Sequence, residues 1–279
     1  SSPVDPQRAA EVRTIGAKHS LIIELRRLLG RRSSRRDSGV VVVEGPKVLL
    51  ELLEAGSPVQ RMLYDIGSAS NEAVANLIAV ADRAGVPLEA VRTGVLDKVL
   101  DSTTPQGVVA LVPRPEHDPA ELATSSNGGA PLLIAAGVQD PGNVGALVRV
   151  AAAAGSPGMV CDRNSADPWG PKALRASTGW ALRYPVAETD ELLAELRRLR
   201  DAGVAIVAAA PGGPAPDEID WSAPTALVMG SEGQGVDAAL LAEFPDRVSI
   251  PMASGVESLN VASAAAVIAF EAARQARIA

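Results

Sequence analysis

Three apolar stretches in the second half of the chain each end in a cluster of small and polar residues. They cover residues 132–136, 225–229 and 248–250. Short apolar runs bounded in this way are typical of strands buried on both faces of a parallel sheet. In open α/β sheets, ligands bind beyond the carboxyl ends of the strands, where loops bring backbone amides and polar side chains together. The three stretches therefore predict one binding site.

The residues that follow these strands form three motifs. The first stretch is followed by Asn143, Gly145 and Arg149, the second by Gly230, Ser231 and Glu232, and the third runs into Ile250, Pro251 and Met252 and then Ser258, Leu259 and Asn260. In order and spacing, the motifs resemble those of the SpoU/TrmH family of RNA ribose 2′-O-methyltransferases, within the SPOUT superfamily of knotted methyltransferases. The resemblance covers about residues 131–275, and residues 171–179 also resemble a segment that the family places between its first two motifs.

The pattern of elements predicts an α/β fold. Beyond residue 130, helices alternate with strands: strands are expected near Leu132, Met159, Ala205, Ala226 and Val248, helices after Gly142, Lys172, Asp190 and Val236, and a final apolar helix over residues 260–274. This alternation predicts a doubly wound, mostly parallel sheet. The resemblance implies a SPOUT α/β-knot, in which the segment from about residue 229 onward threads through a loop as a trefoil knot. No periodicity in the sequence indicates the knot.

The resemblance also implies roles for the motif residues. It implies that S-adenosylmethionine binds in a bent conformation to Met229, Gly230, Ile250, Pro251, Met252, Ser258 and Leu259. Backbone groups suit an adenine edge because they supply donors and acceptors without losing rotamer entropy. The catalytic residue implied by the family is Arg149, within a polar shell of Asn143, Glu232, Ser258 and Asn260.

Two roles are open for Arg149. A guanidinium is normally protonated at any usable pH, so it is an unusual general base. Either a substrate phosphate helps Arg149 to release a proton and to accept one from the ribose hydroxyl, or Arg149 stays charged, binds the phosphate and stabilises the developing alkoxide. Asn143 and Asn260 have a simpler interpretation as well, because each is placed to cap the start of a helix.

The first part of the chain predicts a smaller α/β domain. Helices are expected over residues 20–29, 46–55 and 71–84, and extended segments over residues 40–43, 59–64, 87–91 and 107–112. With short motifs at residues 44–47 and 106–108, this part resembles the ribosomal-protein-like substrate-binding domain that many SpoU/TrmH proteins carry. Residues 113–130 have the Pro-, Ser- and Gly-rich composition of an exposed linker. We therefore expect domains over residues 1–118 and 131–279, with a linker over residues 119–130.

Charge is distributed unevenly along the chain. The net charge of −7 argues against a generic nucleic-acid binder. Residues 1–50 nevertheless hold ten basic and five acidic side chains. A solvated helix end would have such a composition too, but next to an RNA-modifying domain we expect salt-dependent contacts with RNA phosphates. The six arginines that we expect to make them are Arg26, Arg27, Arg31, Arg32, Arg35 and Arg36.

Other classes of protein are disfavoured by composition. No apolar run reaches the roughly 18 residues of a membrane span, and residues 1–13 do not resemble a signal peptide, so we expect a cytoplasmic location. One cysteine and two histidines do not make a metal-binding pattern, and no metal is expected. Cys161 lies in an apolar stretch and is interpreted as a buried structural thiol. Neither a Gly-x-Gly-x-x-Gly turn nor a Walker loop is present.

The expected function is methylation of a ribose 2′-hydroxyl in RNA. A separate leading domain and a basic arm suit a large folded substrate, so 23S rRNA is favoured and transfer RNA is the alternative. A role in antibiotic resistance stays open, because the family includes such enzymes. A non-catalytic RNA-binding or ribosome-assembly protein is a further alternative, which the intact motif residues oppose.

The family is usually homodimeric through its knotted domains, and the apolar helix over residues 261–270 is a candidate for that interface or for the core. Aromatic residues make up only 3% of the chain, so no base-stacking platform is evident.

Overall fold

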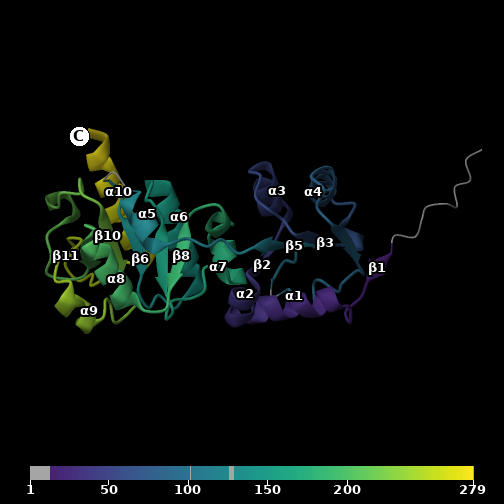
Figure 1. Ribbon diagram of the computed structural model, residues 1–279, viewed down its shortest axis with the longest axis horizontal. Coiled ribbons are helices and arrows are strands. Elements are labelled where there is room, and N and C mark those ends of the chain that lie inside the picture. Colours follow the sequence, from purple (N-terminus) through teal and green to yellow (C-terminus); the bar gives the residue numbers. More distant parts are fainter. Residues whose placement is uncertain (1–12, 101, 126–128, 279) are drawn as a thin grey trace, which may run out of the picture. The chain divides into compact units, whose positions relative to one another are not determined.

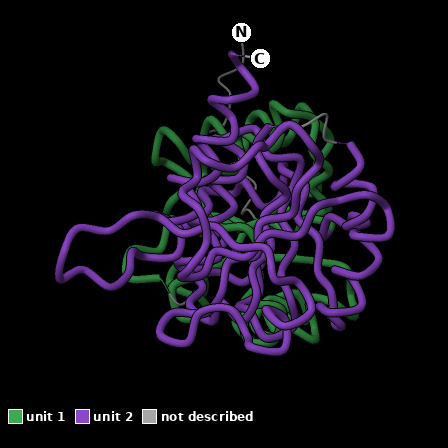
Figure 2. The backbone as a smooth tube through the Cα atoms, turned by 90° about the vertical axis from the view of Figure 1, so that its left-hand side faces the viewer, with its two compact units in different colours: residues 1–113 green, residues 114–279 purple. Residues whose placement is uncertain are grey.

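The computed structural model describes residues 13–100, 102–125 and 129–278. The chain divides into two compact units, Ser1–Pro113 and Arg114–Ala279 (Figure 2). Each unit has its own sheet and its own buried core. Residues 1–12, on which the expectation about a signal peptide depends, lie outside the described residues.

The first unit is built on a mixed five-stranded sheet with the order β1-β4-β3-β5-β2. Strands β1, β4 and β3 are parallel to one another, while β5 runs antiparallel to both β3 and β2. The strands are β1 (Thr14–Ile15), β2 (Val40–Glu44), β3 (Arg61–Asp65), β4 (Leu88–Val91) and β5 (Val108–Pro113). The prediction of a small α/β domain is confirmed, and β1 is a strand that the sequence did not predict.

Helices cover both faces of this sheet. Figure 1 shows α1 (Ser20–Gly30) and α2 (Arg32–Ser38) on one side, and α3 (Pro46–Glu54) and α4 (Glu72–Arg83) on the other. A 3₁₀ turn, Ile66–Ser68, precedes α4. The apolar face of α1 places Ile22, Leu25 and Leu28 against Val42 and Leu63 of the sheet. This packing leaves the opposite face of α1, which carries Arg26 and Arg27, in solvent.

The two short motifs of the first unit lie side by side. The Glu44 carboxylate accepts a hydrogen bond from the backbone N–H of Gln106 at 3.1 Å, and the N–H of Gly45 donates to the carbonyl of Val108 at 3.1 Å. Gly45 has a φ of 107°, and a Cβ there would lie 2.7 Å from the Gln106 side chain. These residues therefore have a structural reason to recur together, where strand β2 turns into α3.

The second unit is built on a six-stranded sheet that is parallel throughout, with the order β11-β9-β10-β6-β7-β8. Its strands are β6 (Leu132–Ala135), β7 (Met159–Asp162), β8 (Val186–Thr189), β9 (Ala205–Ala209), β10 (Thr225–Met229) and β11 (Arg247–Val248). Every residue of β6, β7 and β10 is buried, as the apolar stretches predicted. Cys161 is buried in β7, in agreement with a structural thiol.

Two layers of helices enclose this sheet. One contains α5 (Pro119–Thr124), α8 (Leu192–Asp201) and α9 (Ala238–Glu243), which pack on Leu132, Ile134 and Val228. The other contains α6 (Pro141–Ala154), which packs between α7 (Pro171–Ala176) and α10 (Val261–Ile278). The 3₁₀ turns Trp180–Leu182 (η2) and Pro216–Glu218 (η3) complete the unit. The doubly wound sheet is thus confirmed, while the threading of the last segment as a knot stays a prediction from the resemblance.

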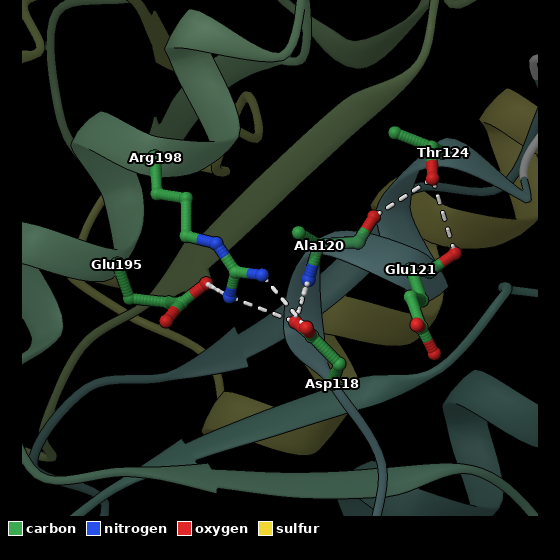
Figure 3. A network of polar contacts seen from close by, with 6 residues as sticks. All are labelled: Asp118, Ala120, Glu121, Thr124, Glu195 and Arg198. Carbon is green, nitrogen blue, oxygen red and sulfur yellow. Dashed lines mark hydrogen bonds and ion pairs between the residues drawn. The ribbon is translucent and has the colours of Figure 1, made fainter.

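The structure differs from the linker predicted over residues 119–130. Residues 119–124 form α5, which buries Leu122 and Ala123 in the core of the second unit. Asp118 caps α5 by accepting from the N–H of Ala120 at 2.9 Å, and its two carboxylate oxygens accept from Arg198 of α8 at 2.8 and 2.7 Å (Figure 3). The Arg198 hydrogen bond also holds the pKa of Asp118 below its ordinary value. The proline-rich composition suggested a linker, but Asp118 and Pro119 are residues that begin a helix. Residues 126–128 of the predicted linker lie outside the described part.

Candidate active site

The first motif lies at the N-terminus of α6. Asp140 caps this helix by accepting a hydrogen bond from the backbone N–H of Asn143 at 2.8 Å, and Pro141 occupies the first turn. Asn143 is thus three residues beyond the cap, so its side chain is not needed to satisfy the helix end. The capping interpretation of Asn143 is wrong, and the amide is available for other contacts.

All three motifs meet in one hydrogen-bonded network. The Asn143 amide nitrogen (Nδ2) donates to Glu232 Oε1 at 2.5 Å. The Asn260 Nδ2 donates to Asn143 Oδ1 at 2.9 Å and to the same Glu232 oxygen at 3.3 Å. These residues are separated by 89 and 117 positions in the chain, so the sheet brings distant segments to one point. The predicted clustering of Asn143, Glu232 and Asn260 is therefore present in the structure.

The direction of this network is determined by the start of α10. Asn260 Oδ1 accepts from the backbone N–H groups of Ala262 and Ser263 at 2.9 and 3.2 Å, so Asn260 does cap the helix. With its oxygen used in this way, Asn260 presents its amide N–H groups to the site. Asn143 must then accept through its oxygen and donate through its nitrogen to Glu232. Helix capping and site formation are both satisfied by one side chain.

Glu232 is carried by a tight turn at the end of β10. Ser231 and Gly235 exchange two backbone hydrogen bonds, of 3.0 and 2.9 Å, which close the turn. A Cβ at Gly230 would lie 2.1 Å from the Gly235 carbonyl carbon, so only glycine fits. Glu232 is exposed, and its second carboxylate oxygen accepts no hydrogen bond from any residue that the structure describes. That oxygen is free for a ligand.

Arg149 lies on α6, further along from Asn143. Its side chain is exposed and makes no hydrogen bond or ion pair within the described residues. Gly145, one helical turn before it, is in close contact with α7: a Cβ there would lie 2.5 Å from the Ala173 carbonyl oxygen and 2.8 Å from the Ser177 nitrogen. The segment over residues 171–179 that the resemblance singled out thus packs directly against the helix that carries Asn143 and Arg149.

The expected cofactor residues lie at the carboxyl edge of the same sheet, although the structure does not join all of them. Met229 ends β10 and is buried, and its carbonyl accepts from the N–H of Ala136 after β6 at 2.9 Å. Residues 249–260 form an irregular loop after β11, in which Ile250 and Met252 are half-buried and Pro251, Ser258 and Leu259 are exposed. The backbone N–H groups of Ile250 and Met252 donate no hydrogen bond to a described residue. Ser258 likewise makes no side-chain contact with the network.

A second network, which the sequence analysis missed, holds the loop before α6. Asp162 Oδ1, at the end of β7, accepts from the Gly137 N–H at 2.9 Å and from the Ser165 hydroxyl at 2.7 Å. The Ser165 oxygen in turn accepts from the N–H of Val138 at 2.9 Å. Asp162 and Ser165 are both buried, at 5% and 3% exposure. The signal that the sequence offered was a carboxylate directly after a buried strand. The network holds the loop that leads from β6 to Asp140 and Asn143 at the start of α6.

The basic residues of the first unit do not all face solvent. Arg26, Arg27, Arg31 and Arg36 are exposed and Arg32 is half-buried. Arg35 is 6% exposed, and its guanidinium donates to the carbonyl oxygens of Leu28 at 2.5 Å and Leu29 at 3.2 Å. Arg35 therefore satisfies the end of α1, and the expectation that it contacts RNA does not fit its position.

Two protein-family models match the chain, one for each unit. The SpoU rRNA methylase family model matches residues 131–270, and the model for the substrate-binding domain of RNA 2′-O ribose methyltransferases matches residues 42–118. No helix in the described part of the chain is long and apolar enough to cross a membrane. Nor do the described His, Cys, Asp and Glu residues gather in any group that would hold a metal ion.

Similar proteins extend over nearly the whole chain. An uncharacterized tRNA/rRNA methyltransferase of Mycolicibacterium gilvum (strain PYR-GCK) is 36% identical over 259 residues, or 91% of this chain and 82% of that protein. The structure of an rRNA methyltransferase from Sinorhizobium meliloti matches with a TM-score of 0.79 and 26% identity, covering 94% of this chain and 98% of the other. The SpoU methyltransferase AviRb from Streptomyces viridochromogenes, solved with the cofactor AdoMet, matches with a TM-score of 0.78 and 27% identity over 94% and 100% of the two chains. The chain therefore belongs to the SpoU rRNA methylase family and is an RNA ribose 2′-O-methyltransferase.

Proposed function

We propose that this protein uses S-adenosylmethionine to methylate one ribose 2′-hydroxyl of 23S rRNA. The observation that carries the proposal is the network of Asn143, Glu232 and Asn260 at the carboxyl edge of the parallel sheet. It leaves one Glu232 oxygen open to a hydroxyl donor, beside the helix that carries an unpaired, exposed Arg149. A carboxylate bound to Asn143 and a positive charge further along the same helix suit a ribose and its phosphate.

The main task of the protein in methyl transfer is to orient the ribose hydroxyl. When bound, S-adenosylmethionine supplies a methyl group on a positively charged sulfur. Transfer would join that carbon to the ribose oxygen as the carbon–sulfur bond breaks, and the hydroxyl proton would have to leave. Glu232 would accept the hydrogen bond of the 2′-hydroxyl and so orient the ribose oxygen. Asn143 and Asn260 keep the carboxylate in place.

Of the two roles open for Arg149, we favour the charged phosphate clamp. No carboxylate of the described chain pairs with this guanidinium, so its five N–H donors are available to an RNA phosphate. The same charge stabilises the alkoxide character that develops on the ribose oxygen. Arg149 is then a binding and stabilising group, while the proton leaves by way of Glu232 or solvent.

The residues at the sheet edge fit the cofactor. The unpaired N–H groups of Ile250 and Met252 offer donors to an adenine edge, and the half-buried side chains of both residues offer apolar contact. Structural relatives also support this assignment, since AviRb was solved with AdoMet. We therefore assign Met229, Gly230, Ile250, Pro251, Met252, Ser258 and Leu259 to cofactor binding.

The choice of ribosomal over transfer RNA rests on the leading unit. Its family model describes substrate binding, and Arg26, Arg27, Arg31, Arg32 and Arg36 add positive charge there. A large folded substrate suits a separate binding domain, whereas relatives are named for both RNA classes. Transfer RNA is therefore the competing substrate.

The proposal is tested by methyl transfer from labelled S-adenosylmethionine to unmodified 23S rRNA, 16S rRNA and bulk transfer RNA, followed by mapping of hydrolysis-resistant sites. We expect one labelled ribose in 23S rRNA, and a loss of at least about 100-fold in rate for Arg149→Ala. The control is Arg200→Ala on α8, which removes an exposed arginine from the other helical layer. If only transfer RNA is labelled, transfer RNA is the substrate and the assignment to 23S rRNA is wrong. If the protein binds RNA but methylates none, the non-catalytic alternative is favoured.

We also propose that the protein is a homodimer that pairs through α10. Val267, Phe270 and Ile278 are 45%, 44% and 72% exposed and recur at helical spacing along one face of this helix. Sedimentation should show a dimer for the wild type and a shift towards monomer for Phe270→Ser. The control is Ile23→Ser, which changes an apolar residue of α1 that is 56% exposed. A monomeric wild type, or an unchanged Phe270→Ser variant, would overturn this interface.

A further inference from the structure

One tryptophan of this chain is placed unlike the other two. Trp169 and Trp221 are each 1% exposed, and their indole N–H groups donate to the carbonyls of Ala181 at 3.0 Å and Pro216 at 2.9 Å. Trp180 is 39% exposed, and its indole N–H has no partner among the described residues. Trp180 is therefore the tryptophan with the most surface open to a partner, and its N–H group is available to that partner.

The backbone around Trp180 holds it in place. Thr178 and Gly179 have φ values of 51° and 76°, so two successive residues lie in the left-handed region where α7 ends. A threonine rarely adopts this conformation, and the chain keeps it through hydrogen bonds from Thr178 N–H to Arg175 (3.0 Å) and from Gly179 N–H to Leu174 (2.9 Å). The following Ala181 and Leu182 are buried. Trp180 is thus the exposed member of an otherwise anchored turn.

A cation already stacks on the indole. The guanidinium carbon of Arg183 lies 4.6 Å from the centroid of the Trp180 ring. This places a positive charge over one face of the ring, while 39% of the residue stays exposed. An indole that is stacked on a cation and partly exposed can take a second flat, electron-rich group.

The surrounding charge selects an anionic partner. Residues 170–183 include Lys172, Arg175 and Arg183 but no Asp or Glu, in a chain whose net charge is −7. Lys172 and Arg175 are exposed on α7. A protein partner of ordinary composition needs no such cluster, whereas a nucleic-acid strand brings a phosphate for every base.

The turn that carries Trp180 packs on a helix of the candidate site. α7 and η2 both pack against α6, the helix that carries Asn143 and Arg149. Enzymes that modify RNA at specific sites usually act on unstacked nucleotides, whose bases are held on aromatic or arginine planes. A ribose that is to reach Glu232 and Arg149 therefore leaves an unstacked base that needs a surface nearby.

We infer that Trp180, supported by Arg183, is the platform on which an unpaired base of the RNA substrate stacks. The inference rests on the proposed RNA-methylating function and adds to it a specificity-determining contact. It differs from the expectation that no base-stacking platform is evident, because it needs only one tryptophan.

The first test uses steady-state methylation by the full chain. Trp180→Ala should raise KM for RNA about tenfold and leave KM for S-adenosylmethionine unchanged, and Trp180→Phe should restore most of the affinity. Arg183→Ala should have a smaller effect of the same kind. Arg200→Ala is the matched control, because Arg200 also lies over an aromatic ring, 5.8 Å from the centroid of the buried Phe244. An unchanged KM for RNA in Trp180→Ala would overturn the inference.

The second test does not depend on catalysis. Because the other two tryptophans are buried, iodide should quench mainly Trp180, and added RNA should protect it. Quenching that RNA does not alter would contradict stacking, and a changed sedimentation coefficient in Trp180→Ala would identify a protein contact instead. Failure of the wild type to methylate any RNA would overturn the proposed function separately.

Discussion

At the scale of single residues, Asn260 couples the site to a helix end. Its oxygen caps α10 and its nitrogen donates to Asn143 and Glu232. Sequence reasoning identified both uses as alternatives, and the structure combines them. For Asn143 the sequence could not decide, because the choice depends on Asp140, which is an equally good cap three residues earlier.

Asn260→Asp should separate the helix-capping role of Asn260 from its role as a hydrogen-bond donor in the site. Aspartate caps a helix as well as asparagine does, so the free energy of unfolding should change by less than about 1 kcal/mol. It cannot donate to Asn143, and it adds a negative charge beside Glu232, so kcat should fall about 10- to 100-fold. Thermal unfolding and methylation kinetics measure the two effects. Asn71→Asp is the control, because Asn71 caps α4 in the same way and lies far along the chain from the site. Equal loss of activity in both variants would contradict the donor role.

At the scale of elements, α6 and α7 are in close contact in the catalytic unit. Gly145 permits it, since an added Cβ would meet backbone atoms of Ala173 and Ser177 that cannot rotate away. Several helix positions followed from the sequence, because α3, α6 and α7 begin at a Pro and α4 at a capping Asn. α2, α5, β1 and β8 did not, because α2 is rich in Ser and Arg, α5 begins in a proline-rich stretch, and β1 and β8 are only two and four residues long.

Gly145→Ala should therefore destabilise the protein by about 1–3 kcal/mol, because α7 has to move away. It should also reduce methylation, since α6 carries Asn143 and Arg149. Denaturant unfolding measures the first effect. Gly30→Ala is the control: nothing lies within 4 Å of an added Cβ at this last residue of α1, and a small gain in stability is expected. A neutral Gly145→Ala would show that the helices separate easily.

An ion pair within α10 predicts how stability depends on pH. Hydrogen bonds from Arg274 and then Gln275 lower the pKa of Glu271 from 4.5 to about 2. Since the folded state lowers this pKa, the carboxylate stabilises the fold above pH 4.5, and the contribution is lost as the pH falls from 4.5 towards 2. The free energy of unfolding of the wild type should approach that of Glu271→Gln over this range. Arg274→Gln should reduce the same dependence, because only the hydrogen bond from Gln275 is left, and identical pH curves for wild type and Glu271→Gln would refute the assignment.

At the scale of the whole molecule, the exposed arginines of the first unit are expected to add a salt-dependent term to RNA binding. Replacing Arg26 and Arg27 by Gln should reduce the slope of log affinity against log salt concentration by about 1.5, if each contacts one phosphate. Filter binding at several salt concentrations measures the slope. Arg83→Gln is the control, because Arg83 lies on α4, across the sheet from α1. An unchanged slope in the double variant would remove these residues from the interface.

The attachment of Asp118 to α8 determines where the catalytic unit can be cut out of the chain. Residues 114–118 precede helix α5 within the second unit, and Arg198 holds the end of that segment to α8. A fragment that starts at residue 119 would lose the cap of α5 and the ion pair to α8 together, although both belong to the second unit. The independently folding part of the chain therefore begins before the helix that its composition disguises as a linker.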